Sequence, residues 1–169
     1  MEIRSIGPFL DYWASIRGRT RRVALCIPPE QLEWRPAAGK FSPGDLVRHL
    51  ATIERWMYAE TVAGRPSRYA GCGPELAAGH DAVIAFLDRL DAESCEIFRG
   101  LSDADLQRKC LTPAGTPITT WKWLRAMVEH ESHHRGQLYL LLGQLGVATP
   151  PLFGLTAEEV QARSAGNSP

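Results

Sequence analysis

Residues 119–146, TTWKWLRAMVEHESHHRGQLYLLLGQLG, decide the fold that this sequence predicts. On a helix at about 100° per residue, five apolar side chains of this stretch fall within a sector about 60° wide. A stripe of this kind is typical of a long helix that packs its apolar face against a core. The stripe consists of Trp123, Met127, Leu138, Leu141 and Leu145.

Two histidines lie on the same stripe. His130 and His134 are about 40° apart on the wheel, where a structural helix would carry leucine or isoleucine. Residues one turn apart have Cβ atoms about 5–6 Å from each other, so their two imidazoles can bind one metal ion. Burying both uncharged rings without a metal would demand several hydrogen-bond partners in an apolar seam. His133 points about 60–100° away and is not expected to be a ligand.

Length, charge and cysteine content limit the classes of function. The 169 residues are enough for one domain with a sizeable core, and we expect a single domain over residues 1–169. Lys plus Arg and Asp plus Glu both number 19, so no net charge favours nucleic acid or an anionic membrane as a partner. No apolar run approaches the length of a membrane span. The four scattered cysteines and the lack of a signal-peptide pattern predict a cytoplasmic protein.

Helical periodicity predicts further helices on both sides of the central stretch. Residues 8–27 form an amphipathic helix, with Arg17 and the arginines that follow it expected on a solvated face. A second helix begins at Ser42, where an S-x-x-D arrangement and the following proline favour a helix start. A third helix is predicted from residue 74 to 99, with His80 on its apolar face.

A capping box at Thr156–Glu159 predicts a short helix near the C-terminus, while residues 109–119 are expected to be extended or turn-rich. Period-2 strand patterns are almost absent from the sequence. The predicted fold class is therefore all-α, a four-helix bundle with a short extra C-terminal helix.

A third inward-facing histidine would complete a metal site. Three histidines with one open position are a standard arrangement for a catalytic metal. His49 lies at the edge of the apolar stripe of the second helix, about 40° from Ile53. His80 is a rival ligand on the third helix, and periodicity alone does not choose between the two.

The H-E-x-x-H pattern of zinc metalloproteases also occurs at residues 130–134, with Glu131 in the position of the general base. The surroundings of the pattern argue against a protease. Leu140 occupies the position of the third histidine of the longer motif, and the chain offers hardly any strand to hold a peptide. A variant in which Glu158 or Glu159 is the third ligand remains open.

Three segments of the chain resemble the DinB/YfiT superfamily of metal-binding four-helix bundles. They are LEWRPAAGKFSPGDLVRHLATIERW, EHESHHRGQLYLLLGQLG and PPLFG, and the resemblance covers roughly residues 8–155. It implies His49, His130 and His134 as the metal ligands. It also implies that the second and fourth helices face each other, that the protein forms a homodimer, and that the metal is a divalent transition ion such as zinc or nickel.

The resemblance further implies chemistry on small molecules, with no role for nucleic acid or membrane. Activities in the family include transfer or isomerisation that depends on a low-molecular-weight thiol, and some members are described as hydrolases. Three neutral imidazoles leave the charge of the ion uncompensated, so a bound thiol or water has a lowered pKa. We expect a thiol-dependent enzyme, with a hydrolase or a non-catalytic metal-stabilised bundle as alternatives. Glu131 and Gln137 are the candidate catalytic residues, placed to orient an imidazole or relay a proton.

Overall fold

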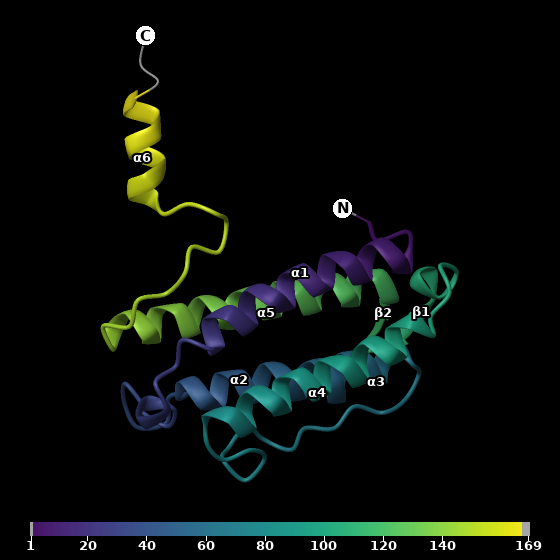
Figure 1. The fold of residues 1–169 in the computed structure, drawn as a ribbon. Helices are drawn as coiled ribbons and strands as arrows, with labels where there is room; N and C mark the ends of the chain where they lie inside the picture. The colour runs from purple at the N-terminus through teal and green to yellow at the C-terminus, as the bar shows by residue number, and fades with distance from the viewer. Residues whose placement is uncertain (1, 167–169) are drawn as a thin grey trace.

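The computed structural model describes residues 2–166 and is mostly helical (Figure 1). Four long helical segments form a bundle, in which α1 packs against α5 and α2 packs against α4. The second segment is continuous from α2 through a π-helical stretch, Glu54–Ala59, into the short α3, Glu60–Val62. The other helices are α1 (Ile6–Ala24), α2 (Pro43–Ile53), α4 (His80–Arg99) and α5 (Thr120–Gln144).

A short helix, α6 (Ala157–Gly166), lies outside the bundle (Figure 1). The predicted capping box is present at its start, where Thr156 and Glu159 each bond the backbone N–H of the other. The predicted fold class, a four-helix bundle with a short C-terminal helix, is confirmed. In the described part of the chain, no helix combines the length and the apolar character needed to cross a membrane.

Helix α2 begins where the sequence predicts. The Ser42 hydroxyl accepts a hydrogen bond from the Asp45 backbone N–H at 3.0 Å, and the Asp45 carboxylate accepts one from the Ser42 N–H at 2.9 Å. Pro43 follows in the first helical turn, where a missing N–H costs nothing. These contacts fix the first turn of the helix that carries His49.

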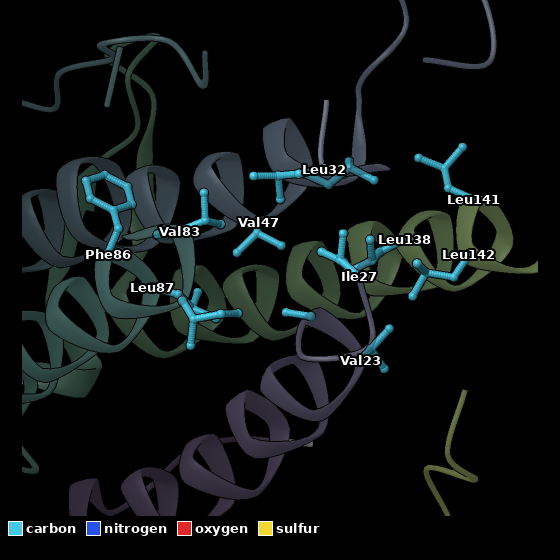
Figure 2. Packing of buried hydrophobic residues seen from close by; sticks show 14 of the residues in the cluster. Val23, Ile27, Leu32, Val47, Val83, Phe86, Leu87, Leu138, Leu141 and Leu142 are labelled. Atoms are coloured by element: carbon cyan, nitrogen blue, oxygen red, sulfur yellow. The ribbon is translucent and has the colours of Figure 1, made fainter. Parts of the chain in front are cut away.

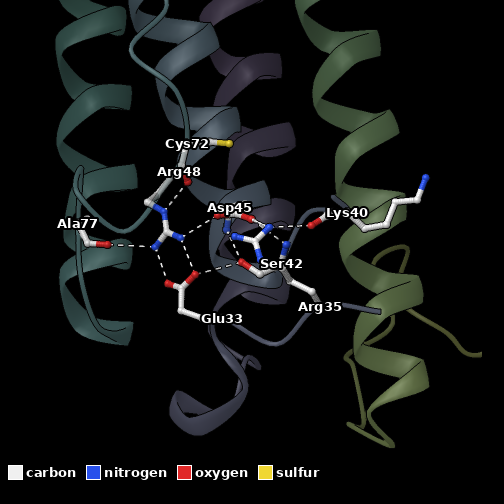
Figure 3. A network of polar contacts seen from close by, with 8 residues as sticks. All are labelled: Glu33, Arg35, Lys40, Ser42, Asp45, Arg48, Cys72 and Ala77. Atoms are coloured by element: carbon white, nitrogen blue, oxygen red, sulfur yellow. Dashed lines mark hydrogen bonds and ion pairs between the residues drawn. The ribbon is translucent and has the colours of Figure 1, made fainter. Parts of the chain in front are cut away.

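A buried arginine attaches this helix to the loop that follows α3 (Figure 3). Arg48 is fully buried and donates to the backbone carbonyls of Cys72 and Ala77 at 2.7 and 3.0 Å. Its guanidinium also forms an ion pair with Glu33 at 2.8 Å and another with Asp45 at 3.1 Å. Every donor direction of a buried guanidinium needs a partner, so this network holds the loop on α2 beside His49.

The core consists of two groups of buried apolar side chains. One group joins the end of α1 to α2, α4 and the end of α5 (Figure 2). Figure 2 shows Val47 from α2, Leu87 from α4 and Leu138 from α5 in this group. The second group is built around Trp13, Phe98 and further residues of α1, α4 and α5. Burial of these side chains from all four segments stabilises the bundle.

Two predicted boundaries differ from the structure. The third helix begins at His80 rather than at residue 74, because Gly79 has a φ of +87° and breaks the helix there. The first helix ends at Ala24, before the predicted residue 27. Residues 109–119 agree with the prediction of an extended or turn-rich segment, because they contain an antiparallel pair of short strands, β1 (Lys109–Leu111) and β2 (Pro117–Thr119).

The buried face of α5 also differs from the predicted stripe. It is centred about 40° from that stripe and includes Leu124, Glu131 and Arg135, which are 0%, 1% and 6% exposed. His130 and His134 therefore lie at the edge of the buried face, half-buried, and not at its centre. Arg17, expected on a solvated face of α1, is 4% exposed and lies opposite Glu131.

Candidate metal centre

Helices α2 and α5 bring three histidines together. His49 projects from α2, and His130 and His134 project from consecutive turns of α5. The Nε2 atoms of His49 and His130 are 3.2 Å apart, and the ring of His134 lies 4.4 Å from that of His130 and 4.6 Å from that of His49, centroid to centroid. One nitrogen from each ring lies within 4.8 Å of the other two. All three side chains are half-buried.

This geometry fits a transition metal. Two imidazole nitrogens that bind one tetrahedral ion at about 2.0–2.1 Å are about 3.3 Å apart, which follows from the tetrahedral angle. The separation of 3.2 Å between the Nε2 atoms of His49 and His130 agrees with this value. A three-histidine set also leaves one tetrahedral position for water or substrate. The donor set therefore suggests a divalent metal.

Neighbouring side chains orient two of the three rings, those of His134 and His49. The Nδ1 atom of His134 lies 2.7 Å from Oε1 of Gln137, so Nδ1–H donates to the amide oxygen and Nε2 keeps a lone pair. The Nδ1 atom of His49 lies 3.4 Å from the Tyr69 hydroxyl. Phe41 stacks on the His49 ring at 5.5 Å between centroids. A hydrogen bond on the outer nitrogen of a ligating histidine fixes its tautomer. Gln137 and Tyr69 are placed to fix the tautomers of His134 and His49 in this way.

The surroundings keep the three imidazoles neutral. Burial, followed by the positive charge that His134 would carry, lowers the pKa of His49 to about 4. Burial, followed by the neighbouring histidines, lowers the pKa of His130 to about 3. Burial also lowers the pKa of His134, and the hydrogen bond that His134 donates to Gln137 opposes this shift. Neutral imidazole is the form that binds a metal ion.

The other two histidines do not direct a donor atom into this cluster, although the His133 ring packs against that of His134 at 4.9 Å between centroids. The His133 side chain is exposed, and its Nε2 lies 3.1 Å from the Gln137 amide nitrogen. His80 stands at the first position of α4, with Nδ1 3.3 Å from the Asp81 carboxylate. Neither belongs to the group of converging donor atoms among the described residues. Of the two rivals for the third position, His49 is the one that the fold brings to His130.

Glu131, one residue after His130, belongs to a different cluster. Its Oε1 atom lies 3.1 Å from Nη1 of Arg17, and both side chains are almost completely buried. Arg17 also forms an ion pair with Glu54 and lies 3.5 Å from the Asp91 carboxylate. We call Arg17, Glu54, Asp91 and Glu131 the ion cluster; each of the four long helical segments supplies one member. The Glu131 carboxylate is thus directed to α1, while Gln137 contacts a histidine of the metal site.

Burial dominates the electrostatics of the ion cluster. It raises the pKa of Glu131 above the ordinary range, and the positive charges of Arg17 and Arg135 oppose that shift. Burial likewise lowers the pKa of Arg135, and Glu131 opposes it. The Arg135 guanidinium donates to the Ile16 carbonyl at 3.2 Å. The Arg17 guanidinium therefore compensates part of the charge of the three carboxylates that the other helical segments bring to it.

Sequence reasoning missed the residues that surround the rings. Phe41 and Tyr69 lie in loops, where no periodicity indicates which way a side chain points. For Arg17, the helical spacing does indicate burial, since it follows Trp13 by one helical turn on the buried stripe of α1. A charged residue in that register is usually found at the surface, so the signal was weak.

Fold and site together define a four-helix-bundle protein with a three-histidine cluster between two of its helices. A family model described as the DinB superfamily matches residues 12–138, most of the chain. The protein belongs to this superfamily.

Solved structures share the fold. A DinB-like protein from Bacillus cereus ATCC 10987 superposes with a TM-score of 0.77 at 20% identity, over 88% of this chain and 97% of its own. YfiT from Bacillus subtilis, described as a probable metal-dependent hydrolase with an unusual four-helix bundle topology, gives 0.66 at 17% identity, over 85% and 89%. A mutant of the mycothiol-dependent maleylpyruvate isomerase gives 0.62 at 13% identity, over 79% and 60%. At these identities the likeness shows the fold alone.

Proposed function

We propose that His49, His130 and His134 bind one divalent transition metal, zinc or nickel, and that the protein is a metal-dependent enzyme acting on a small molecule. The observation that carries the proposal is the convergence of the three donor nitrogens within 4.8 Å, from two helices that the bundle packs together. Three neutral nitrogen donors suit zinc and nickel alike. When bound, the ion supplies a Lewis acid that lowers the pKa of a thiol or water.

Within this proposal, the chain has two tasks at the site. The helices α2 and α5 hold the imidazoles at ligand spacing, and Gln137 holds the Nδ1 proton of His134 so that the opposite nitrogen stays free. Glu131 serves the site indirectly, because its ion pair with Arg17 fixes the turn of α5 that carries His130. The role predicted for Glu131 from the sequence, to orient an imidazole or relay a proton, stays a prediction.

The reaction we propose is transfer or isomerisation that uses a low-molecular-weight thiol. Its support is the shared fold of the mycothiol-dependent isomerase, together with a site that leaves one coordination position for a thiol sulfur. Hydrolysis is the second candidate, supported by the description of YfiT as a probable metal-dependent hydrolase.

One experiment distinguishes the thiol-dependent reaction from hydrolysis. Zinc- and nickel-loaded protein is incubated with panels of electrophiles and of esters or amides, each with and without a thiol cosubstrate. Turnover that needs both metal and thiol supports the transferase, and turnover with metal alone supports the hydrolase. A protein that binds metal and turns over neither panel would contradict the proposed activity and favour a metal-stabilised bundle with a binding role.

A further inference from the structure

A hollow of about 310 Å³ opens beside one of the candidate metal ligands, His49. The ring of His49 is part of its wall, together with Ile53 from α2 and Met57 from the π-helical stretch. Arg68, Tyr69 and Pro113 complete the wall from two loops. The volume lies at the lower end of the range for ligand pockets, about 300–1,000 Å³, so it suits a small molecule.

The π-helical stretch gives this hollow its apolar side. A π-helix is rare, occurs mostly as a single-turn bulge inside an α-helix, and is frequently found at functional sites. Here it begins directly after Ile53, which is 9% exposed, and carries the half-buried Met57. An unbranched thioether adapts its shape to an apolar ligand. The apolar wall and His49 therefore face the same space.

One cation of the wall is held in place without a counter-ion. The Arg68 guanidinium lies 4.4 Å from the centroid of the Trp56 ring, and the Arg68 backbone N–H donates to the Trp56 carbonyl at 2.9 Å. Stacking on an aromatic face fixes a guanidinium and leaves its edge donors available. Arg65, three residues earlier, is instead paired with Glu60. Within residues 2–166, no carboxylate lies at salt-bridge distance from Arg68.

We propose that this hollow binds the substrate of the metal centre, and that the substrate is a small monocarboxylate whose apolar body contacts Ile53 and Met57 while its carboxylate binds Arg68. A planar guanidinium matches a carboxylate with two parallel hydrogen bonds. The proposal rests on the proposed function, because it takes His49 as a metal ligand.

The test uses zinc-loaded full-length protein and a panel of aliphatic and aromatic monocarboxylates, each paired with its neutral amide. Ligand-observed NMR measures the dissociation constants. The best carboxylate should bind at least about tenfold more tightly than its amide, the usual ratio for one charge-assisted bond. Arg68→Met should remove that difference, Arg68→Lys should keep part of it, and Arg65→Met should leave it unchanged. A panel without any preference for carboxylates would overturn the proposal.

A second readout locates the ligand without any arginine variant. The chain has three methionines, and labelling their methyl groups with ¹³C distinguishes Met57 from the buried Met127. The carboxylate should shift the Met57 signal and leave that of Met127 in place. Unmoved Met57 with a bound carboxylate would place the ligand elsewhere and overturn the proposal. Elemental analysis of the same samples separates the two failures: absent zinc contradicts the proposed function, while bound zinc without carboxylate binding contradicts this inference alone.

Discussion

Helix α5 contributes to two polar clusters through residues only one position apart. His130 and His134 face α2 and form the three-histidine cluster with His49. Glu131 and Arg135 face α1 and lie in and beside the ion cluster. The ion cluster contains its own cation, because the Arg17 guanidinium lies between carboxylates. The histidine cluster consists of neutral donors with no cation of the chain among them, and that difference is the physical reason to expect a bound metal at one site and not at the other.

The largest expected effect comes from removing the internal cation. Arg17→Met leaves the carboxylates of Glu54 and Glu131 buried without their partner. The expected loss in the free energy of unfolding is about 3–5 kcal/mol, the usual cost of breaking a buried ion pair from one side. Urea denaturation measures it. The matched control is Arg21→Met, one helical turn further along α1, whose pair with Asp88 is half-exposed and should contribute less than about 1 kcal/mol. Equal effects of the two variants would show that the ion cluster does not stabilise the bundle.

Supplying a cation to the histidine cluster should stabilise the protein to a similar degree. Binding to the folded state alone adds about 4 kcal/mol at a thousandfold excess of zinc over its dissociation constant. The melting temperature should therefore rise with zinc and fall with a chelator. His130→Ala removes one ligand and should melt at the same temperature in both conditions. A zinc response that survives in this variant would place the bound ion elsewhere.

Gln137→Leu should weaken metal binding while leaving all three ligands in place. The Gln137 amide holds Nδ1 of His134 at 2.7 Å, and loss of such a contact typically lowers metal affinity about 10- to 100-fold. Competition with a chromogenic chelator measures the affinity. Gln144→Leu is the control on the same helix, at an exposed position, and should bind metal like the unmodified protein. An unchanged affinity in Gln137→Leu would mean that Gln137 does not orient His134.

The sequence predicts the histidine cluster better than the ion cluster, and the reason is physical. Histidines on an apolar stripe are unusual, so the spacing of His130 and His134 already indicates a metal site. The family resemblance then implies His49, and not His80, as the third ligand. Charged residues such as Arg17 and Glu131 are usually exposed, and only a partner on another helix makes their burial favourable. Because single-helix periodicity contains no information about that partner, the predicted stripe on α5 ran through His130 and not through Glu131.

The loops around the site could not be predicted for a related reason. Ser42 and Thr156 carried local capping signals, and both helices start where those signals indicate. Tyr69 and Phe41 reach the imidazoles through loop conformations that depend on distant contacts, such as the bonds from Arg48 to the loop after α3. Local sequence rules do not describe such contacts.

The stability of the metal-free protein should also depend on pH. Folding lowers the pKa of His49 to about 4 and of His130 to about 3, from an ordinary value of about 6.5. Between about pH 6.5 and pH 4 the unfolded chain therefore binds more protons than the folded protein. The free energy of unfolding should fall as the pH is lowered through this window, and these histidines should contribute no slope above it. Urea denaturation in the presence of a chelator measures the slope, and His49→Gln with His130→Gln should reduce it. The same slope in the double variant would assign the acid sensitivity to other groups.

The most direct test of the central claim is the metal content of purified protein and four variants, measured by elemental analysis after equilibration with zinc. The account predicts one zinc per chain for the unmodified protein and for His133→Ala, whose side chain is exposed outside the cluster. It predicts less than a tenth of that content for His49→Ala, His130→Ala and His134→Ala, with each variant still folded by circular dichroism. Absence of zinc from the unmodified protein, or an equal loss in His133→Ala, would contradict the assignment of the three histidines as a metal site.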